Sequence, residues 1–157
     1  HGDSSRMFVA GKINKKAELL IKTTFECLMR GIEVAKPGNF SGDIGYEIQK
    51  HAESRNYSVV RDFCGHGIGK LFHTPPSISH YGDCGEGLEL KSGMFFTIEP
   101  MINLGDYYTK ILKDGWTAVT KDRSLSAQFE HTVGITENGN EIFTLSRNNS
   151  DFPINTI

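Results

Sequence analysis

The order of its apolar patterns constrains most strongly how this chain can fold, because two helical patterns precede a run of strand-like segments. Apolar residues recur at three- and four-residue spacing over residues 17–28, which predicts a helix that is capped by Asn14 and runs to about Val34. A second helix is expected over residues 41–55. Its inner face would consist of Ile44, Ile48 and Ala52.

The remainder of the chain reads as short strands joined by turns. Three closely spaced glycines predict a bend over residues 65–69, and residues 73–92 are expected to form a loop. Asn138-Gly139 favours a tight hairpin turn, and the polar tail after Arg147 is expected to be loose. Two helices followed by mostly antiparallel strands predict an α+β fold in one domain, residues 1–157. The expected strands are residues 4–10, 57–63, 94–101, 115–121, 127–136 and 141–145.

Composition excludes several classes of protein. Charged residues make up 23% of the 157 residues and the formal net charge is -2, so no electrostatic feature favours nucleic acid or an anionic membrane as a partner. The sequence contains no apolar run near the ~18–20 residues that span a membrane, and no secretory signal. The three cysteines, Cys27, Cys64 and Cys84, follow no paired spacing. We therefore expect free thiols, with Cys27 buried, and a reduced, cytoplasmic setting.

Two glutamates fall in the middle of expected strands. Alternation places Glu99 on one strand face with Phe95 and Thr97, and Glu130 on one face with Gln128 and Thr132. A carboxylate among buried residues is costly unless it is paired or binds a cation. An edge strand with one face in water explains a single such glutamate, but it explains two of them poorly.

A histidine and an aspartate complete a set of metal-ligand residue types. His66 lies between Gly65 and Gly67, where small neighbours allow close approach of a ligand, and Asp3 precedes the first strand-like segment. Oxygen-rich ligands with one imidazole suit Mn, Fe, Co or Zn. Two such ions can hold a water against a scissile carbonyl, so the set indicates a hydrolase. The neighbours of His73 do not decide its role. It could be a second metal ligand, an imidazole that binds substrate, or a loop histidine without function.

Several segments together resemble the type I methionine aminopeptidases, a family with the pita-bread fold. The similarity covers positions 1 to about 145 and includes four motifs in the family's order, together with the N-terminal segment that precedes them. It implies an α+β fold in which a curved, mostly antiparallel sheet carries helices on its outer face. The matching segments are HGDSSRMFVAG, CGHGIGKLFHTPP, SGMFFTIEPM, DGWTAVT and SAQFEHT.

The resemblance assigns metal ligands to this sequence. It implies two divalent ions, of cobalt, manganese, iron or zinc, with Asp3 and Glu130 as bridging ligands. His66 and Glu99 would each bind one ion. The family's first aspartate ligand lies on a strand that precedes Asp3 and is absent from this sequence. We therefore expect these residues to be the C-terminal major part of a catalytic domain, with one metal site short of a ligand if they stand alone.

The resemblance also implies residues that bind substrate. His73 would hydrogen-bond the scissile amide and act in catalysis, and Phe72 and Trp116 would line the pocket for the methionine side chain. The backbone carbonyl of Ser126 would help to bind a monovalent cation.

The implied activity is removal of the N-terminal methionine from nascent proteins, by hydroxide attack at the dinuclear centre with Glu99 as proton shuttle. The implied partners are N-terminal peptides of nascent proteins, with the ribosome left open as a further partner. We expect no direct contact with nucleic acid, no membrane and a monomer. A prolidase or Xaa-Pro aminopeptidase on the same fold and a non-catalytic peptide-binding module are the alternatives. Spacings of 33 and 31 residues between His66, Glu99 and Glu130 favour the type I aminopeptidase.

Overall fold

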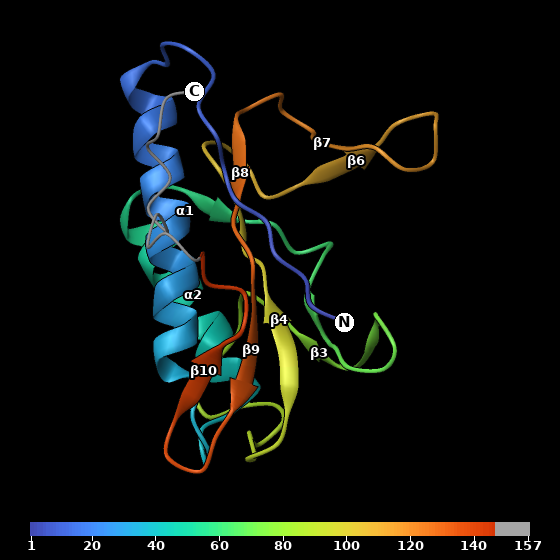
Figure 1. The fold of residues 1–157 in the computed structure, drawn as a ribbon. Coiled ribbons are helices and arrows are strands. Elements are labelled where there is room, and N and C mark those ends of the chain that lie inside the picture. The colour runs from blue at the N-terminus through green and yellow to red at the C-terminus, as the bar shows by residue number, and fades with distance from the viewer. Residues whose placement is uncertain (147–157) are drawn as a thin grey trace.

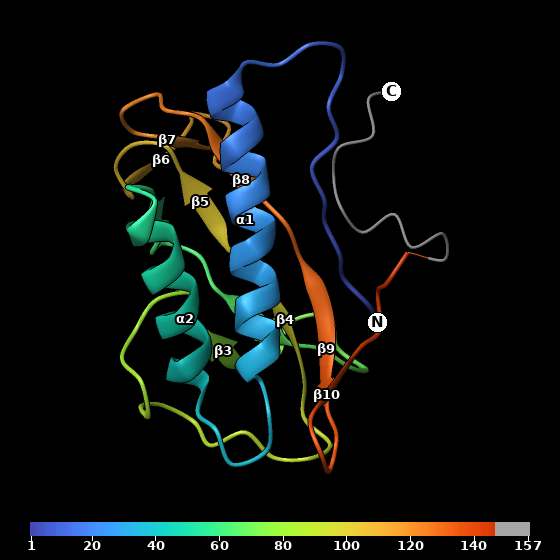
Figure 2. The ribbon, with the colours of Figure 1, turned by 90° about the vertical axis from the view of Figure 1, so that its left-hand side faces the viewer.

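Two helices lie side by side and cover one face of the strands (Figures 1 and 2). The computed structural model describes residues 1–146, so the tail expected to be loose after Arg147 lies outside the described residues. Helix α1 spans Lys15–Val34 and helix α2 spans Ser41–Ser54, which confirms both expected helices. The Asn14 side chain accepts a hydrogen bond of 2.9 Å from the backbone N–H of Ala17. It therefore satisfies one free N–H in the first turn of α1, as its cap position predicts.

Every pairing between the described strands is antiparallel. One sheet has the order β10-β9-β4-β2-β3, a second has the order β1-β5-β8, and β6 and β7 form a separate hairpin. The α+β class with antiparallel sheets is thus confirmed. The strands are β1 (Ser58–Val59), β2 (Gly65–Gly67), β3 (Thr74–Ile78), β4 (Phe95–Ile98), β5 (Met101–Asn103), β6 (Thr109–Ile111), β7 (Ala118–Thr120), β8 (Ser126–Gln128), β9 (His131–Ile135) and β10 (Asn140–Ile142).

The first part of the predicted bend is a strand, because Gly65–Gly67 form β2 and the bend begins only at Gly69. Strand β2 lies between β3 and β4 in the sheet. A Cβ atom on Gly65 would lie 2.2 Å from the carbonyl oxygen of Thr97, and one on Gly67 would lie 2.2 Å from the carbonyl oxygen of Pro75. These glycines therefore allow neighbouring backbones to approach closely. The segment that follows was expected to be a loop, but it begins with β3.

Both expected glutamate strands are interrupted beside the glutamate. Residues 94–101 divide into β4 and β5, and residues 127–136 divide into β8 and β9. Pro100 follows Glu99 and has no N–H to donate to a ladder. The backbone N–H of Glu130 instead donates to the carbonyl of Ser5 at 2.9 Å. The interruptions therefore lie at the two residues whose side chains were expected to bind metal.

Other strands are shorter than the sequence indicated. Residues 57–63 contain only β1, and residues 115–121 contain only β7. Strand β6, which pairs with β7, was not predicted from the sequence. The expected strand at residues 4–10 is replaced by isolated bridges, at Ser5, which pairs with Glu130, and at Val9. The β9–β10 hairpin is confirmed, with Asn140 opposite Ile135.

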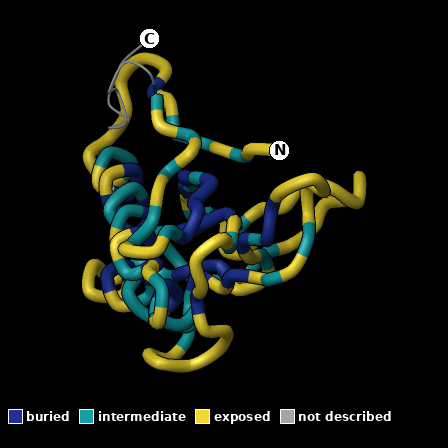
Figure 3. The backbone as a smooth tube through the Cα atoms, turned by 60° about the horizontal axis from the view of Figure 1, so that its bottom comes forward, coloured by how far each residue is buried: buried dark blue, intermediate teal, exposed yellow. Residues whose placement is uncertain are grey.

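Buried residues lie in the body of the molecule and exposed ones along its projecting segments (Figure 3). The core joins α1 and α2 to the inner faces of the strands through residues such as Leu28, Ile48 and Phe96. The three cysteines are free, and Cys27 is buried as expected. Its burial raises the pKa of the thiol to about 12. Neither helix of residues 1–146 is long and apolar enough to cross a membrane.

Candidate metal centre

The N-terminal segment is attached beside β9 by backbone hydrogen bonds. Ser5 and Glu130 exchange two of them, at 2.9 and 3.3 Å. The hydroxyl of Thr132 accepts a hydrogen bond from the N–H of Asp3 and donates one to its carbonyl, both at 2.8 Å. Thr132 shares a strand face with Glu130. This pairing brings Asp3 to the glutamate although the two are far apart in the sequence.

The four residues expected to bind metal converge. Ligand atoms of Asp3, His66 and Glu130 all lie within 4.8 Å of one another. The Nε2 atom of His66 lies 3.7 Å from Oδ2 of Asp3 and 3.7 Å from Oε1 of Glu99. The chain therefore gathers three carboxylates around one imidazole.

Hydrogen bonds fix the orientation of the imidazole. The Nδ1 atom of His66 lies 3.1 Å from the carbonyl oxygen of Gly67. Because a carbonyl only accepts, Nδ1 carries a hydrogen, and Nε2 is the ring nitrogen that faces the carboxylates. A backbone carbonyl behind a histidine is a common partner of metal-binding imidazoles.

Glu99 is held from three sides. The Thr97 hydroxyl donates a hydrogen bond of 2.7 Å to Oε1 of Glu99, and Nε2 of Gln128 lies 3.4 Å from Oε2. The backbone N–H of Glu99 donates to Nε2 of His80 at 3.0 Å. The buried position of His80 lowers its pKa to about 3, so the ring is neutral and can accept. The contact of His80 with Glu99 was not predicted from the sequence, because His80 lies in a polar stretch without any recognisable pattern.

The carboxylates repel one another where they meet. Burial, together with the neighbouring carboxylates of Glu99 and Asp3, raises the pKa of Glu130 from 4.5 to about 8. Burial also raises the pKa of Glu99, although the Thr97 hydroxyl and His66 oppose the shift. Buried like charges are stable only with a proton or a cation between them. The arrangement therefore fits a divalent cation, and its oxygen-rich donor set with one imidazole suits first-row metals.

Two of the expected substrate-binding residues lie beside this cluster. The ring of His73 is 4.3 Å from that of His66, measured between centroids, and the Phe72 ring is 5.8 Å from His66. Trp116 lies in the turn of the β6–β7 hairpin with 88% of its surface exposed. Ser126 begins β8 and pairs with Asn103 on β5. The expected roles of Trp116 and Ser126 stay predictions.

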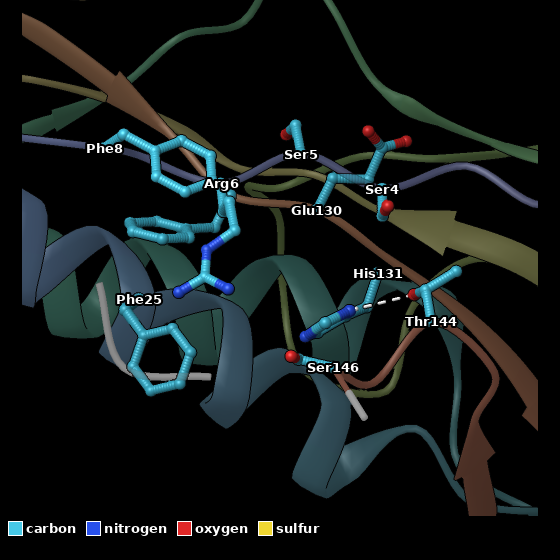
Figure 4. A pocket seen from close by; sticks show the side chains of 10 residues that line it. Ser4, Ser5, Arg6, Phe8, Phe25, Glu130, His131, Thr144 and Ser146 are labelled. Atoms are coloured by element: carbon cyan, nitrogen blue, oxygen red, sulfur yellow. Dashed lines mark hydrogen bonds between the residues drawn. The ribbon is translucent and has the colours of Figure 1, made fainter. Parts of the chain in front are cut away.

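A separate pocket of about 240 Å³ lies on the other side of β9 (Figure 4). Figure 4 shows the carboxylate of Glu130 pointing away from the pocket and the ring of His131 pointing towards it. The Nδ1 atom of His131 lies 2.9 Å from the hydroxyl of Thr144. Phe8 and Phe25 supply apolar walls. The opposite directions of the two neighbouring side chains confirm the alternation expected here and separate this pocket from the carboxylate cluster.

Comparison with known proteins places this geometry in a family. Residues 1–137 match metallopeptidase family M24. A methionine aminopeptidase of Rickettsia prowazekii is 58% identical over 98% of this chain, which covers 60% of that relative. The methionine aminopeptidase of Salmonella typhimurium is 53% identical over 96% of this chain, which covers 57% of it. The chain thus spans somewhat more than half the length of these relatives.

Solved structures agree with the sequence matches. The crystal structure of methionine aminopeptidase from Rickettsia prowazekii superposes with a TM-score of 0.91 at 60% identity, over 92% of this chain and 58% of that one. A prolidase from Pyrococcus furiosus superposes with a TM-score of 0.72 at 28% identity, over 93% of this chain and 37% of that one. The fold is therefore the pita-bread fold that these proteins share, and the chain belongs to metallopeptidase family M24.

Proposed function

We propose that this protein is a metal-dependent aminopeptidase that removes the N-terminal methionine from newly synthesised proteins. The observation that carries the proposal is the convergence of Asp3, His66 and Glu130, with ligand atoms within 4.8 Å of one another, and of Glu99 at 3.7 Å from His66. Identities of 58% and 53% to two methionine aminopeptidases support this substrate over the Xaa-Pro bond of a prolidase, which is matched at 28%.

The residues present fit a divalent cation, and we propose two such ions as the cofactor, one of them short of the ligand that the family's first aspartate would supply. Asp3 and Glu130 would bridge the ions, and His66 and Glu99 would each bind one. Manganese, iron, cobalt and zinc all suit this donor set. When bound, such ions act as Lewis acids towards a carbonyl and lower the pKa of water. A monovalent cation at the carbonyl of Ser126 is a further proposal.

The chain's own residues would handle the protons and the substrate. Glu99 is positioned by Thr97 and Gln128, so its carboxylate can take a proton from the attacking water and pass it to the departing amine. His73 stands beside His66 and would donate a hydrogen bond to the carbonyl oxygen as negative charge develops there. Phe72 and Trp116 would hold the methionine side chain.

We further propose that residues 1–157 belong to a single catalytic domain and form its C-terminal part. The family match over residues 1–137 and the greater length of the relatives support this division. The substrates would be the exposed N-termini of nascent chains. The protein would act as a monomer, and the ribosome is a candidate partner.

A peptide panel tests the proposed function. The purified protein, supplied with Mn²⁺, is offered Met-Ala-Ser, Leu-Ala-Ser and Ala-Pro-Ser, and the free amino acid is measured by chromatography. We expect methionine release at least tenfold faster than leucine release and no alanine release. Faster cleavage of Ala-Pro-Ser would instead identify a prolidase-type activity. No cleavage of any peptide, together with no tight Mn²⁺ binding, would contradict the proposal and favour a peptide-binding module.

A further inference from the structure

The β6–β7 hairpin projects from the two sheets as a separate unit (Figure 1). The residues of its two strands are half-buried or exposed, and none of them belongs to the hydrophobic core. A cavity of about 490 Å³ is lined by Thr109 and Val119 of the hairpin and by Phe63 and Met101 of the body. Attraction between apolar side chains requires close contact, so packing contributes little to holding the hairpin in place.

Two consecutive residues of the body contact the start of the hairpin. The hydroxyl of Thr109 donates a hydrogen bond to Oδ2 of Asp62. The guanidinium carbon of Arg61 lies 4.3 Å from the centroid of the Tyr107 ring, within the distance of a cation–π interaction. Together these contacts attach β6 to the segment between β1 and β2.

The segment that provides these contacts is itself firmly held. Val60 is buried, and its N–H donates a hydrogen bond of 3.0 Å to the carbonyl of Met101. The guanidinium of Arg61 also lies 5.2 Å from the centroid of the Tyr81 ring. The backbone of Tyr81 packs so closely against α2 that a Cβ atom on Gly45 would lie 2.4 Å from its carbonyl oxygen. Arg61 therefore lies between the hairpin and a loop whose position is fixed.

The same segment leads directly to the candidate metal centre. The next strand after Asp62 is β2, which carries His66 four residues further along the chain. The turn of the hairpin carries Trp116, whose surface is 88% exposed, so packing does not fix its position. The place of Trp116 relative to His66 therefore depends on how the hairpin is attached.

We propose that Arg61 and Asp62 are positioning residues that hold the hairpin so that Trp116 is in place for the methionine side chain. This inference rests on the aminopeptidase function proposed above, which assigns Trp116 to the methionine pocket. Asp62 restrains the first strand of the hairpin through Thr109, and Arg61 restrains it through Tyr107. A pocket wall that is already in place binds a side chain without the cost of ordering the wall, so the attachment acts on KM.

The fluorescence of Trp116 measures the attachment without any assay of activity, because it is the only tryptophan among the 157 residues. Thr109→Val removes the hydroxyl and keeps the shape of the side chain, and Arg61→Leu removes the cation. We expect each variant to increase the amplitude of the nanosecond motion of Trp116 at least twofold in time-resolved anisotropy. Since both residues lie outside the core, the circular dichroism spectra should match that of the parent protein.

Kinetics on the protein loaded with Mn²⁺ test the role in substrate binding. With Met-Ala-Ser as substrate, Thr109→Val and Arg61→Leu are each expected to raise KM by about three- to tenfold and to change kcat by less than twofold. Thr109→Ser keeps the hydroxyl and should behave as the parent protein does. Thr120→Val is the matched control. Thr120 pairs with Thr109 across the hairpin, but its hydroxyl donates to the carbonyl of Ser124.

The outcomes separate this inference from the proposed function. Unchanged motion of Trp116 in both Thr109→Val and Arg61→Leu would overturn the attachment, and so would equal changes in Thr109→Val and Thr120→Val. Greater motion with an unchanged KM would overturn the role in substrate binding and leave the proposed function standing. If the parent protein releases no methionine, the proposed function fails, and the fluorescence alone decides whether Arg61 and Asp62 hold the hairpin.

Discussion

The hydroxyl of Thr97 connects two of the candidate metal ligands. It donates a hydrogen bond of 2.7 Å to Oε1 of Glu99 and accepts one of 2.9 Å from the backbone N–H of His66. Thr97 and Glu99 lie two residues apart on one face, and His66 comes from the neighbouring strand β2. One buried side chain thus sets the relative position of an imidazole and a carboxylate.

Thr97→Val is expected to weaken metal binding while the fold is retained. Valine matches the shape of threonine but cannot hold Glu99 in place, and loss of such a supporting contact lowers metal affinity by roughly 10- to 100-fold. Titration calorimetry with Mn²⁺ measures the change. Thr24→Val is the matched control, since that buried hydroxyl donates only to the carbonyl of Leu20 within α1. Equal affinities for the two variants would show that the Thr97 hydroxyl does not position the ligands.

The stability of the metal-free protein should fall as pH rises from about 4.5 towards 8. Burial and the carboxylates of Glu99 and Asp3 raise the pKa of Glu130 from 4.5 to about 8. Since the folded-state pKa is raised, this contribution is complete below pH 4.5 and is lost as pH rises through 8. Thermal melts in the presence of a chelator, with Glu130→Gln as the variant that cannot titrate, measure the effect. Parallel pH profiles for the two proteins would contradict the assignment.

Metal binding should show the opposite pH dependence. A cation must displace the proton from Glu130, so Mn²⁺ is expected to bind roughly 50-fold more weakly at pH 6 than at pH 8 if the pKa of Glu130 is about 8. The shift of the melting temperature on adding Mn²⁺, measured at both values, checks this. A shift of the same size at pH 6 and pH 8 would mean that Glu130 is already ionised in the metal-free protein.

Protonation of His80 should destabilise the folded protein below pH 6.5. Its buried ring accepts a hydrogen bond from the N–H of Glu99, and burial lowers its pKa from 6.5 to about 3. With the folded-state pKa depressed, the contribution is complete above pH 6.5 and is lost below it by about 1.4 kcal/mol per pH unit. His80→Gln keeps an acceptor but cannot titrate at these values. Urea unfolding at pH 7.5, 6.0 and 5.0 should show the parent protein losing stability faster than the variant, and equal losses would contradict the role of His80.

Two helix glycines should respond very differently to alanine. A Cβ atom on Gly45 would lie 2.4 Å from the backbone carbonyl oxygen of Tyr81, which cannot move freely. A Cβ atom on Gly31 would lie 2.8 Å from the terminal methyl of Ile48, which can change rotamer. We expect Gly45→Ala to lower the free energy of unfolding by about 2–3 kcal/mol. Gly31→Ala should change it by less than about 1 kcal/mol, because helix propensity offsets part of the clash. Denaturant unfolding measures both, and similar values would contradict the contact geometry.

The sequence predicted features that depend on neighbouring residues. The cap at Asn14 and the apolar stripes of α1 and α2 are local, so both helices begin and end close to where they were expected. Strand alternation placed Thr97 with Glu99, as their hydrogen bond confirms. The four candidate ligands that the fold brings together were predicted from their residue types and strand positions, and the resemblance assigned their separate roles.

Features that depend on distant contacts were not predictable from local patterns. The glycines at residues 65–69 looked like a bend because nothing local reveals that Gly65 packs against the carbonyl of Thr97. Strand β6 exists through pairing with β7, and its exposed residues carry no clear alternation. His80 lies in the segment between β3 and β4, and only the tertiary fold brings its ring to the N–H of Glu99.

Metal-dependent methionine release tests the central claim most directly. The protein is stripped with a chelator, assayed on Met-Ala-Ser, then reloaded with Mn²⁺ and assayed again, with free methionine as the readout. The carboxylate cluster predicts no release from the stripped protein, recovery on reloading, and at least a hundredfold loss of recovered activity in Glu130→Ala. Release that is unchanged by stripping, or that survives in Glu130→Ala, would contradict the assignment of Asp3, His66, Glu99 and Glu130 as a catalytic metal centre.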